Sequence, residues 1–426
     1  MPAKAKWTVL TYIAAHNNLG QLGQLSRNEI VAVGSTGDVR HGVMYDGPGG
    51  GARYVIGAPN SAEDQDLLYS FDSGDPDSLI ETTRWLFDKY PADRYGLVLW
   101  SHGTGWAPDE VEQVAIEARP GAGAEKDEAK QRSTAPGSLV LFRSTLRSLL
   151  TPAQRSERAI LFDDGTGHSL DTLELARVTR TIRDAIGGPL EFLGMDACLM
   201  ANVEVAWELR DCARYLVASE ELVPGHSWPY REVYSGLRDD PGQGGETLSC
   251  AVVKHYVDFF TKNPPGAGDV TKVAVDLTHL AALGEACQAL ATALRGDMAK
   301  HAGIVWQVQA DTRQRETRDE QRTMNKFQYH LWDLGAFASG LAAATSASSA
   351  VRTAAGDVVR ALASGAGAVL AEGHVGNWFD GIGGLSVYLI PPGAQQIARS
   401  YSELAFSKDT GWGDMLAAYH ASARGR

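Results

Sequence analysis

The stretch LVLWSHGTGW, residues 97–106, joins an apolar run to a polar turn that is rich in glycine. This pattern is typical of a buried parallel strand that stops at the edge of its sheet. Open α/β sheets bind ligands at the carboxyl ends of their strands, so His102 is a candidate site residue. Gly103 lets backbone approach a substrate closely, and we expect an N–H near it to stabilise an oxyanion.

A second apolar run, EFLGMDACLM at residues 191–200, ends in the same way and delivers Cys198 to the same edge. A neighbouring imidazole converts a thiol into the nucleophilic thiolate. Alone, a buried cysteine is usually a small core residue, and a lone histidine is usually a satisfied polar group. Two strand ends that present both groups together favour catalysis, with His102 as the base, Cys198 as the nucleophile and the Cys198 N–H as a second oxyanion donor.

Apolar segments of strand length alternate with helical patterns through the first half of the chain. This alternation predicts an α/β fold with a mainly parallel sheet sandwiched by helices. The expected helices are 76–89, with Asp75 as its N-cap, and 169–186. The expected strands are 7–14, 42–45, 95–100, 159–162, 191–195 and 214–218.

The composition and hydrophobic pattern of the sequence change along the chain, and these changes indicate its domain organisation. Residues 107–158 are rich in Gly, Ala, Pro and charge, which predicts an exposed insertion. From about Pro241 onward, long Ala-rich helical patterns at 277–298 and 332–370 precede a strand-like segment at 384–390. We expect a catalytic domain at 1–240 and a helix-rich C-terminal α/β region at 241–426 packed on it.

Composition excludes several classes of function. The chain has 426 residues and a formal net charge of −13, which disfavours nucleic acid as a partner. We expect no membrane association, because no run approaches the ~20 apolar residues of a spanning helix. The four cysteines form no C-x-x-C pair, so neither a zinc site nor a disulfide framework is predicted, and we expect a reducing, cytoplasmic location. The oligomeric state is left open.

Several segments resemble the clostripain-type (C11) cysteine endopeptidases, which have the caspase-like fold and a histidine that precedes the cysteine. The resemblance lies in WTVLTYIAAHNNL (7–19), YPADRY (90–95), WSHGTGW (100–106) and MDACLM (195–200), and more weakly in ASEELVPG (218–225), WPY (228–230), GLSVY (384–388) and Trp412. The chain departs from the family at His16, where an aspartate is expected, and at His226-Ser227, where the family often shows a glycine-containing turn. The resemblance implies a peptide hydrolase that acts on protein or peptide substrates.

The resemblance also implies a substrate preference. Asp196 matches an aspartate at the floor of the family's specificity pocket (S1), which would favour a basic residue, Arg or Lys, on the amino side of the cut bond (P1). The alternative is an ordinary turn aspartate that accepts backbone N–H bonds. Glu220 and Glu221 are secondary candidates for the same cationic subsite, with a solvated loop as the alternative.

Basic residues in the insertion suggest that the chain processes itself. Arg119, Lys126, Lys130 and Arg132 are candidate cut sites in a linker that would hold the uncut chain as a zymogen. The alternative is a solvated loop with incidental basic residues.

Two rival functions and one ligand stay open. The rivals are a catalytically silent caspase-like binding or scaffold module, and an acyltransferase or ligase that uses the same dyad. No cofactor is required for the dyad. Residues 163–167 weakly resemble a calcium loop, so calcium stays open as a ligand, and no metal ligands are assigned.

Overall fold

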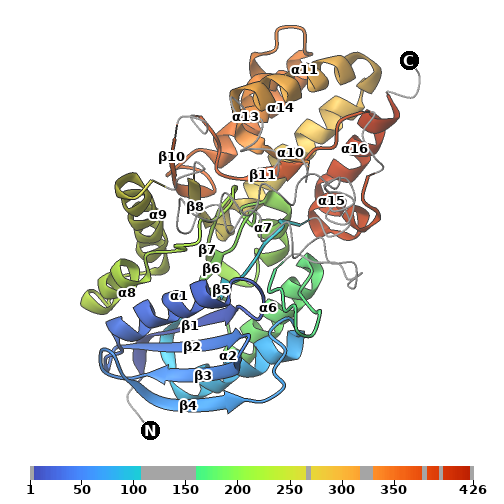
Figure 1. The fold of residues 1–426 in the computed structure, drawn as a ribbon. Helices are drawn as coiled ribbons and strands as arrows, with labels where there is room; N and C mark the ends of the chain where they lie inside the picture. Colours follow the sequence, from blue (N-terminus) through green and yellow to red (C-terminus); the bar gives the residue numbers. More distant parts are fainter. Residues whose placement is uncertain are drawn as a thin grey trace, which may run out of the picture.

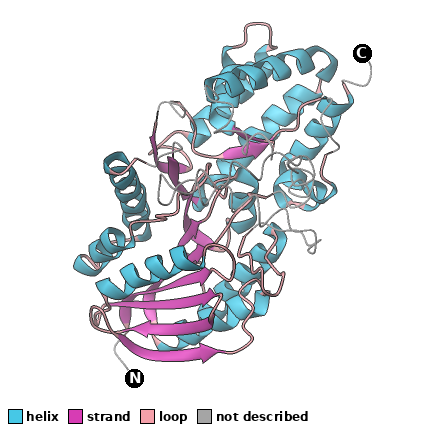
Figure 2. Cartoon of the chain, viewed as in Figure 1, coloured by secondary structure: helices cyan, strands magenta, loops and turns pink. Residues whose placement is uncertain are grey.

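The computed structural model describes residues 4–106, 160–264, 270–316, 330–376, 381–392 and 397–422. Within these residues, a nine-stranded sheet of order β10-β8-β7-β6-β5-β1-β2-β3-β4 runs through the molecule, with helices on both faces (Figures 1 and 2). A separate two-stranded sheet pairs β9 with β11. The expected α/β class, with a largely parallel sheet between helices, is confirmed.

The centre of the sheet is parallel and its edges are antiparallel. The parallel strands are β2 (Val39–Gly47), β1 (Ala5–Ala14), β5 (Ala92–Trp100), β6 (Leu190–Asp196) and β7 (Ala213–Ala218). One edge adds the hairpin β3 (Gly50–Ile56) and β4 (Ala62–Leu68), and the other adds β8 (Val270–Asp276) and β10 (Val369–Val375). The central strands read as apolar runs because both of their faces are covered.

Each face of the sheet has its own apolar core. On one face, α1 (Gly20–Val33), α8 (Tyr230–Asp239) and α9 (Gly245–Lys262) supply the buried side chains. On the other face lie α2 (Pro76–Lys89), α6 (Thr172–Ile186) and α7 (Val203–Leu209). Asp75 caps α2 as predicted, since its Oδ2 accepts the N–H of Ser78 at 2.9 Å.

The C-terminal part adds a helical layer, seen at the upper end of Figure 1. It contains β9 (Leu331–Asp333), β11 (Ser386–Tyr388), the 3₁₀ turns η1 (Leu277–His279) and η3 (Arg399–Glu403), and the helices α10 (Leu280–Arg295), α11 (Met298–Glu316), α13 (Leu334–Ala343), α14 (Ser349–Leu362), α15 (Ala405–Thr410) and α16 (Trp412–Ala421). The expected boundary near Pro241 falls between α8 and α9. Because β8 and β10 belong to the central sheet, that sheet continues past this boundary.

Three expected elements differ from the structure. Of the expected strand 159–162, the described residues form only isolated bridges at Ile160, because Leu161 has a φ of 61°, which no strand residue adopts. The pattern at 332–370 breaks into β9, α13, α14 and the start of β10, since Asp333 and Ser348 cap new helices. Only 386–388 of the expected strand 384–390 pair as β11.

Two expectations about chain organisation remain. The insertion at 107–158 lies outside the described residues, so its exposure stays a prediction. Among the described helices, none is long and apolar enough to cross a lipid bilayer.

Candidate active site

The register of two parallel strands brings the two candidate catalytic segments together. Trp100 at the end of β5 lies opposite Asp196 at the end of β6, so His102 and Cys198 each follow this pair by two residues. A Cβ on Gly103 would lie 2.4 Å from the carbonyl oxygen of Cys198, so only glycine allows the two turns to approach this closely. The strand-end placement expected from the sequence is therefore what the backbone shows.

His102 is buried and held from the neighbouring strand. Its ring is 1% exposed, it packs edge-on against Phe162 with 6.0 Å between ring centroids, and its Nε2 lies 2.7 Å from Oδ1 of Asn18. Asn18 follows β1, the strand beside β5. An amide oxygen only accepts, so this contact places the hydrogen on Nε2 and leaves Nδ1 basic. Burial lowers the pKa of His102 to about 3.

Cys198 is also buried and neutral. It is 2% exposed, and burial raises the pKa of its thiol to about 12, although the Val223 N–H and the Lys272 ammonium both lower it. The Val223 N–H donates to Sγ at 3.2 Å. Leu199, the next residue, has a φ of 62°, a costly conformation for a bulky side chain that marks a constrained turn. Burial therefore disfavours the thiolate at this position.

Asp196 is 3% exposed, and one of its two carboxylate oxygens takes all the hydrogen bonds of the group. Oδ2 accepts from the Ser227 hydroxyl, from the Trp228 N–H at 3.2 Å and from the Tyr230 hydroxyl at 2.8 Å. Oδ1 is buried and has no hydrogen-bond partner in the part of the chain that the structure describes. Burial raises the pKa of Asp196, while Lys272 and the three donors lower it. A turn aspartate would accept N–H groups from neighbouring residues, whereas these three donors all come from the distant segment 227–230.

Glu220 and Glu221 follow β7, the strand beside β6, and are 1% and 4% exposed. Their backbone N–H groups both donate to the Thr271 hydroxyl, at 3.1 and 3.2 Å. The carbonyl of Glu221 accepts the Leu199 N–H at 3.2 Å, which ties this segment to the turn that carries Cys198. A solvated loop, the alternative for these two residues, is wrong because both side chains are buried.

Sequence reasoning missed two residues of this region. Asn18 was noted within a matching segment but was given no role. Lys272 was not considered, although a lysine inside the apolar strand VTKVAVD is unusual. It is fully buried in β8, with Nζ 4.1 Å from the ring centroid of Tyr256. The sequence does contain a signal for Lys272, because the strand pattern calls for an apolar residue at this position.

A second cluster lies at the ends of β1 and β2. Nδ1 of His16 is 3.1 Å from Oδ1 of Asp163 and 3.9 Å from Oδ2 of Asp46, and one ligand atom from each of the three residues lies within 4.8 Å of the other two. The segment 163–167 forms a turn closed on Asp163, whose Oδ1 accepts the N–H groups of Gly165 and Thr166 at 2.8 and 3.1 Å. Burial raises the pKa of Asp46 to about 6. One imidazole and two carboxylates form a donor set that suits a divalent cation.

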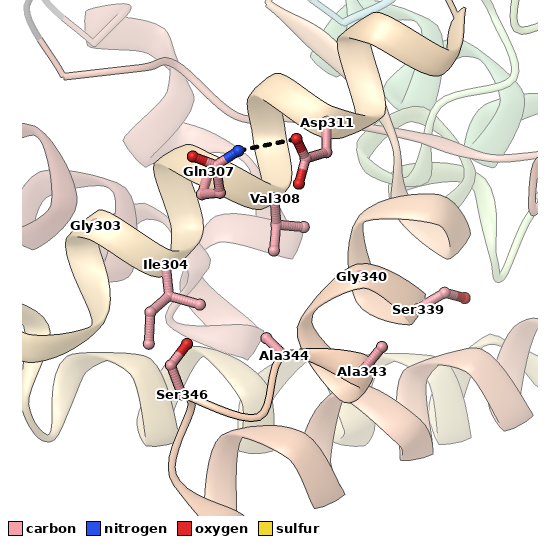
Figure 3. A pocket seen from close by; sticks show the side chains of 10 residues that line it. All are labelled: Gly303, Ile304, Gln307, Val308, Asp311, Ser339, Gly340, Ala343, Ala344 and Ser346. Carbon is pink, nitrogen blue, oxygen red and sulfur yellow. Dashed lines mark hydrogen bonds between the residues drawn. The ribbon is translucent and has the colours of Figure 1, made fainter.

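A surface pocket elsewhere belongs to the helical layer and contains none of the predicted site residues. It lies between α11 and α13, where Gln307 donates to Asp311 at 2.9 Å (Figure 3). Its lining comprises Gly303, Ile304, Gln307, Val308, Asp311, Ser339, Gly340, Ala343, Ala344 and Ser346. Small residues line most of it, and the described lining residues include no histidine or cysteine.

The chain belongs to the clostripain family of C11 peptidases, whose sequence profile matches residues 11–118 and 140–419. The resemblance and the peptidase class expected from the sequence are confirmed. The gap at 119–139 contains all four candidate processing residues, Arg119, Lys126, Lys130 and Arg132, which lie outside the described residues. No curated protein matches the sequence.

Solved structures with the same fold are C11 proteases. A secreted C11 cysteine protease from Bacteroides thetaiotaomicron in complex with an irreversible peptide inhibitor is 19% identical with a TM-score of 0.61, covering 96% of this chain and 99% of that one. A structure of the Bacteroides thetaiotaomicron secreted protease called iotapain is 15% identical with a TM-score of 0.60, at 96% and 100% coverage. An inactive zymogen C11 protease from Parabacteroides distasonis is 17% identical with a TM-score of 0.59, at 96% and 99% coverage. At these identities the likeness establishes the fold.

These comparisons correct the expected location. Two of the similar structures are described as secreted proteases, so the cytoplasmic expectation is wrong. That expectation rested on the lack of a disulfide pattern, and all four cysteines are indeed free thiols. Free thiols do not fix the compartment, because a domain with a large apolar core is stable without disulfides.

Proposed function

We propose that His102 and Cys198 are the catalytic dyad of a cysteine endopeptidase that cuts after basic residues. The observation that carries this proposal is the parallel register of β5 and β6, which sets the two residues at matching positions beyond the sheet. The close approach of Gly103 to the Cys198 carbonyl oxygen supports it. A nucleophile and a base on adjacent strand ends are what acyl transfer to a thiol requires.

The reaction proceeds in two halves. The Cys198 sulfur attacks the scissile carbonyl carbon, its proton passes to His102, and backbone N–H groups near Gly103 and Cys198 stabilise the oxyanion. His102 then protonates the amine, which leaves as the C–N bond breaks. Water attacks the thioester as His102 takes its proton, the C–S bond breaks, and His102 returns the proton to the Cys198 sulfur, which leaves the carboxylic acid and the thiol. Asn18 fixes the tautomer of the imidazole through its contact with Nε2.

The P1 preference rests on buried negative charge beside the nucleophile. Oδ1 of Asp196 has no hydrogen bond, so it is the acceptor that remains for a guanidinium or an ammonium. Glu220 and Glu221 add two buried carboxyl groups at the end of the neighbouring strand. An uncharged P1 side chain that cannot donate would leave Oδ1 of Asp196 buried without a hydrogen bond, which disfavours its binding.

We propose further that the uncut chain is latent. Burial keeps Cys198 protonated and His102 uncharged, so the pair lacks the thiolate needed for attack. Cleavage of the insertion at Arg119, Lys126, Lys130 or Arg132 would relieve this restraint, and the preference for basic residues lets the enzyme cut itself. The zymogen description of the Parabacteroides distasonis structure supports this proposal.

The dyad works without a cofactor in this proposal. A divalent cation would be held by His16, Asp46 and Asp163, the donor set gathered at the ends of β1 and β2, and its imidazole suits a transition metal better than calcium, which takes oxygen ligands. Asn18 lies two positions after His16 and contacts His102. A cation there would therefore act on the position of the base rather than on the substrate.

The test is turnover of matched peptide reporters with P1 arginine, lysine, alanine and aspartate, with mass spectrometry of the chain before and after activation. We expect cleavage after arginine and lysine, release of products to water rather than to added amines, and covalent labelling of Cys198 by a peptidyl ketone that carries arginine. Transfer to the amine in place of hydrolysis would identify an acyltransferase. Failure of Cys198 to react selectively would identify a silent binding module and refute the dyad.

A further inference from the structure

Lys272 is a buried cation that the proposed reaction does not use. It lies in β8 with its side chain on the sheet face covered by α8 and α9, between Val270 and Ala274, which belong to that core. Its residue exposure is 0%, and its Nζ has no hydrogen-bond partner among the described residues. Two rings shield the ammonium, that of Tyr256 at 4.1 Å and that of Trp228 at 5.2 Å from Nζ to the centroid.

The charges that act on Lys272 belong to the proposed active site. Burial lowers the pKa of Lys272 to about 8, while Asp196 and Cys198 both raise it. Trp228, whose ring shields the ammonium, also donates its N–H to Asp196. Lys272 and the candidate specificity residue therefore share one buried environment, in which each leaves one polar atom, Nζ and Oδ1, without a hydrogen bond.

Among the described residues, the other elements packed against Lys272 bring no second cation close to its ammonium. On β10, the residue directly opposite Lys272 is Gly373, which has no side chain. Its neighbours Glu372 and His374 pair with each other at 2.8 Å. From α9 comes the neutral Tyr256 hydroxyl, and burial raises its pKa further. Glu220 and Glu221 follow β7, but the charges that shift the pKa of Lys272 are those of Asp196 and Cys198.

Burial of an ammonium without a hydrogen bond is costly, and removal of its counter-charge makes the cost larger. A basic P1 side chain that binds Asp196 would take over the anion that now offsets Lys272. Two cations would then share one carboxylate in a medium of low dielectric constant, where their repulsion is strong. A neutral P1 side chain would bring no such repulsion.

We propose that Lys272 is a specificity-determining residue, an internal cation that competes with a basic P1 side chain for Asp196 and limits the preference for arginine and lysine. This inference rests on the proposed function and adds a second determinant to the same pocket. The family's aspartate alone predicts a strong, constant basic preference. Lys272 makes the preference for a basic P1 residue weaker, and the preference then depends on whether Lys272 is charged.

The pH dependence follows from the direction of the Lys272 shift. The ammonium is charged at low pH and loses its charge as the pH rises through about 8. An arginine substrate stays charged throughout, because guanidinium groups deprotonate only above about pH 12. The preference for P1 arginine should therefore grow as Lys272 becomes neutral. A ratio of two substrates isolates this effect, since titration of the dyad cancels between them.

The experiment compares kcat/KM for reporters with P1 arginine and P1 citrulline, its uncharged isostere, from about pH 6.5 to about pH 9.5. In the activated wild-type enzyme we expect the arginine-to-citrulline ratio to rise about tenfold across this range. In Lys272→Met the ratio should be high at every pH and flat. Lys254→Met, which removes an exposed lysine of α9 paired with Asp258, serves as the control and should behave as the wild type does.

Each result decides the proposal. A flat ratio in the wild-type enzyme, or a Lys272→Met ratio equal to that of the wild type at every pH, would overturn the role of Lys272 while cleavage itself stands. Absence of cleavage of both reporters, together with no labelling of Cys198, would overturn the proposed function and the inference with it. The wild-type pH series requires no variant, so a folding defect in Lys272→Met leaves the proposal falsifiable.

Discussion

Two buried pairs of a thiol and a carboxyl group occupy different parts of the molecule. Asp196 ends β6 and Cys198 follows it at the edge of the sheet, whereas Glu204 lies on α7 and Cys287 on α10 of the helical layer. Burial raises the pKa of all four groups, and that of Glu204 reaches about 7. Burial and residue type alone therefore do not tell a catalytic pair from a structural one.

The neighbours make the difference. Glu204 accepts the Tyr388 N–H at 2.9 Å and the Tyr401 hydroxyl at 2.8 Å, so it ties β11 and η3 to α7. Asp196 takes its donors from the segment 227–230 and has a buried lysine close by. Cys198 also precedes Leu199, which has a positive φ, and the register of β5 and β6 sets His102 at the position that matches Cys198. We therefore interpret Glu204 and Cys287 as structural, because Glu204 joins distant segments. We interpret Asp196 and Cys198 as catalytic candidates, because Oδ1 of Asp196 has no hydrogen bond among the described residues.

The largest difference between the two pairs should appear when each cysteine is replaced by alanine. Cys198→Ala removes the nucleophile, so turnover of the arginyl reporter should fall by about 10⁴-fold or more, with an unchanged melting temperature. Cys287→Ala should leave turnover intact and lower stability by about 1 kcal/mol, because it removes one buried sulfur. Reporter kinetics and thermal unfolding of both variants measure this. Residual full activity in Cys198→Ala would remove the basis of the comparison.

The carboxyl groups allow the same matched change. Asp196→Asn should lower kcat/KM for P1 arginine by about 10²-fold and leave P1 citrulline nearly unaffected, since only the charged substrate needs the anion. Glu204→Gln should leave both values near those of the wild type. Equal losses for the two substrates in Asp196→Asn would show that Asp196 supports the turn and does not select the substrate.

Stability should respond to pH at Glu204. Its pKa is raised from 4.5 to about 7 by burial, so between these values the folded state binds more protons than the unfolded state. The free energy of unfolding therefore falls as the pH rises through this window, by about 3 kcal/mol at most. Denaturant unfolding at several pH values should show this loss in the wild type relative to Glu204→Gln. Parallel pH curves for the two proteins would contradict the assignment.

Asn18 tests how the base is held. Asn18→Ala should lower kcat about tenfold and leave KM nearly unchanged, because the imidazole loses the acceptor that fixes its tautomer. Asn18→Asp keeps an acceptor and adds a charge, so it should restore turnover and shift the acid limb of the pH–rate profile. A change in KM alone would place Asn18 in substrate binding instead.

Much of this architecture can be predicted from the sequence, because short-range features of the sequence determine where these strands and helices begin and end. Apolar runs that stop at polar turns identified β1, β5, β6 and β7, and capping by Asp75 fixed the start of α2. The β3–β4 hairpin escaped prediction because its strands, GGARYVI and AEDQDLL, contain no long apolar run. Lys272 and Asn18 escaped because their roles arise from strand order: β8 and β1 are far apart in the chain, and each supports a residue from another strand.

The smallest effect should come from chelation of metal. The proposed dyad needs no cofactor, so EDTA should change kcat/KM for the arginyl reporter by less than about twofold. The cluster of His16, Asp46 and Asp163 lies near Asn18, so a cation bound there would act through the position of His102. His16→Ala therefore serves as the matched control: a loss of activity on chelation that persists in this variant would place the metal elsewhere. A large loss of activity on chelation that disappears in His16→Ala would show that a metal held by the cluster helps to position His102. The catalytic pair would then differ from the structural pair in its dependence on a metal as well.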